Sequence, residues 1–193
     1  MHKTYMDKLQ TELVTNDGRL KLTLSQMIDH YFIVVFLLFI PGLTIHSLYQ
    51  MYVTETYDGV RSATELTLSS IPFIVLAIVF VFIQRNALKF TEVLVDYDEH
   101  KFCDAVNLTV GQLKWKIERN DNKMFRAYRQ WNWSASWGEM VTIIKKKDRL
   151  LINSICDPNR MSSVTSWGWN KRNIETFKSN LLSKHEHSSI DLN

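Results

Sequence analysis

Two apolar stretches decide the fold: "YFIVVFLLFIPGLTI", Tyr31–Ile45, and "LTLSSIPFIVLAIVFVFI", Leu66–Ile83. Neither stretch contains a charged side chain. Buried helices of a soluble bundle would carry polar residues at helical spacing on one face, and neither stretch does. Because about 20 apolar residues span the hydrocarbon core of a bilayer, the sequence predicts transmembrane helices at residues 28–49 and 66–84.

Charges outside these helices predict how the chain crosses the membrane. The connecting loop, residues 50–65, is acidic, whereas Arg85 and Lys89 directly follow the second helix. Basic residues are retained on the cytoplasmic side, so we expect both termini in the cytoplasm and the loop outside. The first apolar stretch has no small-residue cleavage site after it, which favours an uncleaved anchor over a signal peptide.

The 193 residues therefore divide into four predicted parts. Residues 1–27 form a cytoplasmic leader and residues 28–84 a transmembrane helical hairpin. Residues 85–183 form a cytoplasmic domain, and residues 184–193 a disordered tail. The apolar residues are concentrated in the hairpin, and the domain carries an excess of basic over acidic residues.

Hydrophobic periodicity within the cytoplasmic part predicts a small α+β domain. Alternation from Thr91 to Tyr97 is typical of a strand, and the apolar spacing from Phe102 to Leu113 is typical of a helix. We expect a mostly antiparallel sheet of four to five strands flanked by two helices that lie on one face of the sheet. The other predicted elements are a strand that begins at residue 115, strands at 123–130, 139–145, 149–156 and 161–167, and a helix at 170–183.

Five of the six tryptophans lie in two segments, "WNWSASWGEM" (131–140) and "SVTSWGWNKR" (163–172). One interpretation is that these rings close the ends of a thin core, with Gly138 and Gly168 permitting tight turns. The other is a rim that binds a ligand, a partner or lipid headgroups. Its candidate residues are Trp131, Trp133, Trp137, Glu139, Trp167 and Trp169.

Asn170 is a plausible N-cap of the last helix, followed by Lys171 and Arg172 in the first turn. Cations oppose the helix dipole at that position. Together with unpaired N–H groups they could hold a phosphate, a carboxylate or a lipid headgroup. Alternatively, both side chains are solvated or paired with Asp157 or Glu175.

A second basic segment, "KKKDR" (145–149), lies at the tip of the predicted hairpin between two strands. Near an anionic membrane such a tip would contact headgroups, and the candidates are Lys145, Lys146, Lys147 and Arg149. A solvated tip kept soluble by its charge is the alternative.

A search for catalytic and ligand-binding motifs predicts no enzyme. The sequence contains no G-x-S-x-G, H-E-x-x-H, phosphate-binding loop or G-x-G-x-x-G pattern. Cys103 and Cys156 are not accompanied by the ligands of a zinc site and are expected to be reduced core thiols. We therefore expect no catalytic residue, no metal, no cofactor and no nucleic-acid partner.

The segment from Asn132 to Phe177 resembles a domain of small bacterial two-span membrane proteins of unknown function. It is also similar to an accessory domain that precedes the membrane core of some bacterial rhomboid-type proteases. The resemblance covers residues 100–183 and implies an accessory α+β module. The chain departs from a rhomboid protease because it has two spans and no Gly-x-Ser-x-Gly, so proteolysis is not implied. The residues that carry the resemblance are Trp137, Glu139, Asn153, Ser154, Cys156, Gly168, Asn170, Lys171, Asn173 and Ile174.

These observations predict a membrane-anchored accessory or interaction protein of the bacterial inner membrane. Such a protein would contact membrane lipid and a protein partner or a second copy of itself, as a subunit of a larger assembly or as an immunity-type protein. The alternative is a membrane-tethered sensor that binds an anionic ligand or headgroup through the tryptophan-rich loops and the basic helix N-terminus.

Overall fold

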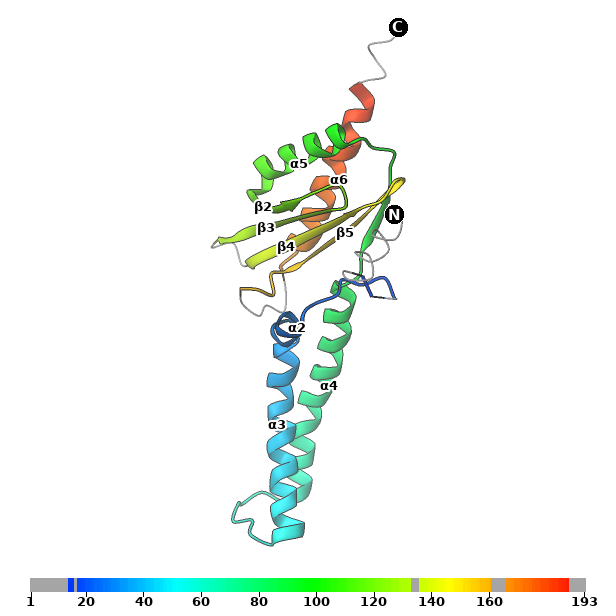
Figure 1. Cartoon of the computed structure of the whole chain (residues 1–193). Coiled ribbons are helices and arrows are strands. Elements are labelled where there is room, and N and C mark those ends of the chain that lie inside the picture. The colour runs from blue at the N-terminus through cyan, green and yellow to red at the C-terminus, as the bar shows by residue number, and fades with distance from the viewer. Residues whose placement is uncertain (1–13, 16, 133–135, 161–165, 188–193) are drawn as a thin grey trace.

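The structure is a computed structural model that describes residues 14–15, 17–132, 136–160 and 166–187. Two long helices lie side by side as a rod, and an α+β domain sits on one end of the rod (Figure 1). The elements in chain order are α2 (Leu24–His30), α3 (Phe32–Tyr49), the π-helical turn η1 (Gln50–Thr54), α4 (Ala63–Ala87), β1 (Thr91–Leu94), α5 (Glu99–Leu113), β2 (Trp115–Asn120), β3 (Met124–Asn132), β4 (Ser136–Lys145), β5 (Arg149–Cys156) and α6 (Trp169–His187).

The two long helices are apolar on all sides and contact each other along a narrow stripe. The spans Phe32–Thr54 and Ala63–Ala87 are long and apolar enough to cross a membrane, and only 17% and 11% of their most apolar windows are buried. A core helix of a soluble protein buries a whole face, whereas a narrow seam between two packed helices takes at most about two residues in seven on each. The seam residues are Val34, Pro41 and Thr44 of α3 and Ser70, Ala77 and Gln84 of α4.

Both apolar helices start at other residues than predicted, whereas α3 ends at Tyr49 as predicted and α4 ends three residues later than predicted, at Ala87. The helical conformation is interrupted at Tyr31, so residues 28–30 belong to the separate short helix α2. This helix starts at a capping box made by Thr23 and Gln26. A second capping box, Ser62 with Glu65, starts α4 at Ala63 rather than at residue 66. Hydropathy locates apolar helices but ignores their polar first turns, which capping residues define.

The domain contains a five-stranded antiparallel sheet in the order β1-β5-β4-β3-β2. Helices α5 and α6 both cover the face of the sheet that is turned away from the rod (Figure 1). This confirms the predicted α+β fold with two helices on one side. The core between these layers is centred on Phe102, Phe125 and Phe177, none of which is exposed to solvent.

The other face of the sheet packs against the end of the rod at which α4 ends; this end is called the inner end of the rod below. Met140 and Ile155 pack there against Leu20 and Leu88. The side-chain amide Nδ2 of Asn153 donates to the carbonyl oxygens of Ala87 and Lys89, each at 2.9 Å, and so satisfies carbonyls at the end of α4. The domain is therefore fixed to the helical hairpin by packing and by hydrogen bonds to its backbone.

Two further predictions of chain organisation need correction. Residues 17–22 are not a separate leader, because the N–H of Leu20 donates to the carbonyl of Leu88 at 2.8 Å and the Leu20 side chain is buried under the sheet. Helix α6 continues to His187, beyond the start of the tail predicted at residue 184. The strand predicted at 161–167 lies mostly outside the described residues, and Trp167 and Gly168 form a turn.

Candidate functional site

The two tryptophan-bearing segments meet at one end of the sheet. Glu139 of β4 is paired with Cys156 at the end of β5, and the N–H of Asp157 donates to the Gly138 carbonyl at 3.0 Å. Helix α6 then begins at Trp169, beside the end of β3. Trp133 lies outside the described residues, as do the side chains of Trp131 and Trp137.

The three described tryptophans occupy different environments. Trp115 is buried in the core, and Trp169 is partly buried against it. Trp167 has 70% of its surface exposed and a φ of 50°, followed by Gly168 at φ 87°. The core-closing interpretation therefore fits Trp169 but does not account for Trp167, because an exposed indole on left-handed backbone gains no core burial.

A buried ion pair lies beside Trp169. The Arg129 side chain is 3% exposed and that of Glu139 is fully buried, with Arg129 Nε 2.5 Å and Nη2 3.3 Å from the two Glu139 carboxylate oxygens. The Arg129 guanidinium carbon lies 3.7 Å from the centroid of the Trp169 ring, and that of Arg172 lies 4.6 Å from it. Glu139 therefore acts through Arg129 to hold the indole, and is not aimed at solvent.

A network of buried polar side chains links α6 to the sheet. Asn173 is fully buried, accepts a hydrogen bond from Trp115 Nε1 at 3.0 Å, and donates to Ser154 Oγ at 3.1 Å. Ser154 Oγ in turn donates to Asn170 Oδ1 at 3.2 Å. A satisfied network of this kind fixes the rotation of α6 on the sheet, since any slip leaves buried polar atoms unpaired.

The predicted N-cap role of Asn170 is wrong. Asn170 lies inside α6, and its N–H donates to Ser166 Oγ at 3.2 Å, so Ser166 provides the capping side chain. Lys171 is exposed, Arg172 stacks on Trp169, and Asp157 pairs with Arg160 at 3.3 Å instead of with either cation. The basic residues thus flank a helix start whose capping position is already filled.

Lys145 does not lie at the surface, which contradicts its predicted role as a headgroup contact. Its side chain is 2% exposed, with Nζ 2.7 Å from Glu99 Oε1, 3.0 Å from Asn120 Oδ1 and 4.1 Å from the centroid of the Phe102 ring. The expectation failed because Lys145 belongs to β4 and has the same strand parity as the buried Val141 and Ile143.

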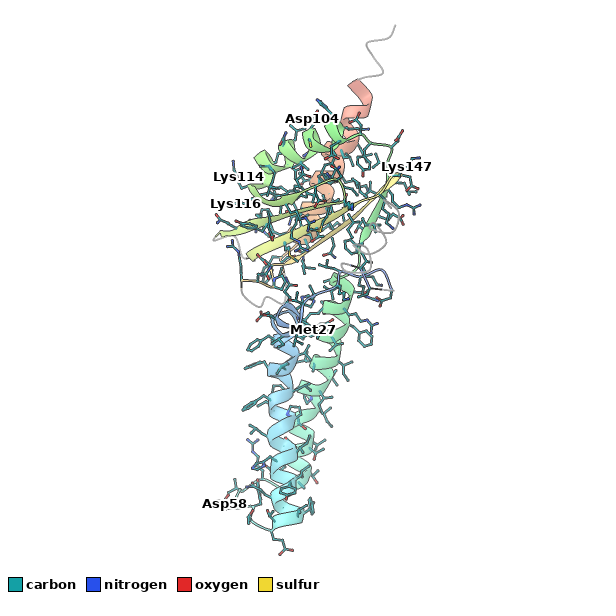
Figure 2. All side chains as sticks on the ribbon, viewed as in Figure 1. Met27, Asp58, Asp104, Lys114, Lys116 and Lys147 are labelled. Atoms are coloured by element: carbon teal, nitrogen blue, oxygen red, sulfur yellow. The ribbon has the colours of Figure 1, made fainter. Side chains whose placement is uncertain are left out.

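The rest of the basic tip lies away from the apolar rod. Lys147 is exposed at the end of the sheet, whereas Met27 marks the inner end of the rod (Figure 2). Arg149 is held by Asp148 at 2.9 Å and Glu92 at 2.5 Å, and the backbone N–H of Lys146 closes the turn. This arrangement favours a solvated tip over a headgroup contact.

Near this tip, Tyr97 Oη donates to the Lys146 carbonyl at 2.9 Å. Partial burial, together with the nearby Glu99 carboxylate, raises the pKa of Tyr97 to about 12. The phenol therefore stays protonated throughout the physiological range and serves as a structural donor.

Comparison of the chain with protein-family models, with curated proteins and with solved structures gives no match. The described residues define an α+β protein with two long apolar helices, whose tryptophan-rich end combines a buried ion pair, a buried amide network and one exposed indole.

Proposed function

We propose that this chain is a membrane-anchored accessory protein of the bacterial inner membrane, with both termini in the cytoplasm and the α+β domain serving as an interaction module. One observation carries the proposal: the apolar surface of α3 and α4 remains largely exposed after the two helices have packed on each other. In water such a surface would drive aggregation, whereas in a bilayer it is solvated by lipid.

The docking of the domain on the rod supports the same proposal. Asn153 and Leu20 bind the backbone at the end of α4, so insertion of the rod would hold the domain close to the membrane surface in one orientation. A module held in this way presents a fixed surface to a partner in the same membrane or in the cytoplasm. We infer a subunit of a larger assembly, or an immunity-type protein, as its role.

The topology can be tested with Asp58, in the loop at the outer end of the rod, and Lys147, on the domain (Figure 2). In a background of Cys103→Ser and Cys156→Ser, we expect a membrane-impermeant maleimide to label the Asp58→Cys variant in intact spheroplasts. The Lys147→Cys variant should be labelled only after lysis. Labelling of Lys147→Cys in intact cells, or release of the full chain by alkaline carbonate, would contradict the proposed anchoring.

The exposed indole of Trp167 is the residue that we expect to contribute most to partner binding. Buried tryptophans at interface centres cost on the order of 2 kcal/mol or more when truncated, which is about a thirtyfold loss of affinity. We expect the Trp167→Ala variant, purified in mild detergent, to lose a protein that co-purifies stoichiometrically with the wild type. Leu182→Ala, which removes an exposed apolar side chain from α6, is the matched control. Equal retention of the partner by both variants would exclude Trp167 as the contact.

A further inference from the structure

A pocket of about 310 Å³ opens where the end of α5, the start of β2, the end of β3 and the start of α6 meet. Its volume is at the lower end of the range for small-molecule sites. It differs from the anion site predicted at Lys171 and Arg172, because neither of these is among the described residues that line it. Its principal lining residues are Leu113, Lys114, Lys116, Arg129, Gln130 and Trp169.

The charge of the pocket is positive. Lys114, Lys116 and Arg129 contribute to its lining, and no acidic side chain is among the described residues that line it. Glu139 neutralises Arg129 from the interior, but within the described ranges no carboxylate is paired with Lys114 or Lys116. The two lysines therefore leave an uncompensated positive charge at a concave surface, which favours an anion.

The inner wall of the pocket is rigid. Arg129 is almost fully buried, and its guanidinium is held on one side by Glu139 and lies against the Trp169 ring at 3.7 Å. Leu113 is buried at the end of α5 and adds an apolar surface beside the ring. A planar or apolar group would meet a preorganised wall there, so little ordering cost accompanies its binding.

The backbone of Lys114 has an unusual conformation for a lysine. Lys114 ends α5 in the left-handed conformation, with φ 57° and ψ 41°. Glycine or asparagine normally occupies such a position, because left-handed backbone costs other residues about 1–2 kcal/mol. The lysine at this position places a cation in the lining of the pocket.

We propose that this pocket binds a small soluble ligand in which a carboxylate or phosphate is attached to a planar ring. The anion pairs with Lys114 and Lys116, and the ring packs against Leu113 and Trp169. Lys114 and Lys116 lie on the flank of the domain, well removed from Met27 at the inner end of the rod (Figure 2). This position favours a soluble ligand over a headgroup of the membrane below.

The test uses the full chain labelled with 5-fluorotryptophan in phosphatidylcholine nanodiscs, with the Trp169 resonance assigned from a Trp169→Phe variant. Titration with phenyl phosphate should shift this fluorine resonance saturably, whereas phenol, which lacks the anion, should not. The double variant Lys114→Gln with Lys116→Gln should weaken phenyl phosphate binding by about tenfold or more, since hydrogen bonds to charged groups are the stronger ones.

A second double variant, Lys101→Gln with Lys147→Gln, removes the same charge elsewhere on the domain, from the half-buried Lys101 and the exposed Lys147, and should bind phenyl phosphate like the wild type. Equal weakening by both double variants, or the absence of a saturable shift, would overturn the proposed site. A Trp169 shift caused by phosphatidylglycerol in the nanodisc alone would overturn the assignment to a soluble ligand and identify a lipid headgroup instead.

Discussion

The Glu139→Ala variant is expected to destabilise the α+β domain by about 3–5 kcal/mol, because it leaves the Arg129 guanidinium buried without its counter-ion. Arg129 is 3% exposed and cannot turn to solvent without leaving Trp169, whose ring it contacts at 3.7 Å. All six tryptophans lie in the domain and none in the helical hairpin. Denaturant unfolding followed by tryptophan fluorescence in detergent therefore reports the stability of the domain alone.

The matched control is the double variant Arg129→Met with Glu139→Leu, which removes both charges and keeps most of the volume. Apolar replacement of a whole buried pair is often neutral, so the double variant should lie much closer to the wild type than the single one. If Glu139→Ala and the double variant unfold at the same denaturant concentration, burial of an unpaired charge is not the cause of the destabilisation. The loss of stability relative to the wild type would then reflect lost packing in both variants.

The elements that sequence patterns predicted well are those that short-range features of the chain define. In α5, the helical spacing of Phe102, Ala105, Val106, Thr109 and Leu113 matches the buried face. The hairpin of β4 and β5 was predicted from two β-rich runs separated by a short charged turn, and the register agrees with it. The helix follows from local periodicity, and the hairpin follows from the turn between two β-rich runs.

The burial of two charged residues, Arg129 and Glu139, was not predicted from the sequence. Arg129 has the same parity as the buried Phe125 and Ala127, and Glu139 the same parity as Val141. Strand alternation thus contained the signal, but Glu139 was predicted as a binding residue of the rim, and Arg129 was not singled out. Such residues are buried only when paired, and pairing between strands depends on register, which the sequence does not specify by itself.

The contact between the sheet and the rod could not be predicted from local sequence patterns either. It joins Asn153 to the carbonyls of Ala87 and Lys89, more than sixty residues earlier in the chain. Met140 and Ile155 alternate along their strands with residues that face α5 and α6. In a domain of two layers this pattern would predict that they are exposed to solvent. Their burial becomes understandable only because the segment around Leu20 covers them.

The Phe102→Ala variant is expected to cost about 3–5 kcal/mol of domain stability, the range for removing a fully buried aromatic ring. Phe102 is not exposed at all, and its ring centroid lies 5.9 Å from that of Phe125 and 5.7 Å from that of Phe177. The ring also lies 4.1 Å from the ammonium of Lys145. Truncation therefore opens a cavity in the core and removes the aromatic face beside a buried cation.

Two control variants separate these contributions in the same fluorescence-detected unfolding measurement. Leu108→Ala removes an exposed apolar side chain from the same helix and should change stability by less than about 0.5 kcal/mol. Phe102→Leu keeps much of the volume but removes the aromatic face, so its cost measures the contact with Lys145 plus a smaller cavity. If Phe102→Leu is as stable as the wild type, the contact between the Lys145 ammonium and the ring contributes nothing. Lys145 is then held in the core by Glu99 and Asn120 alone.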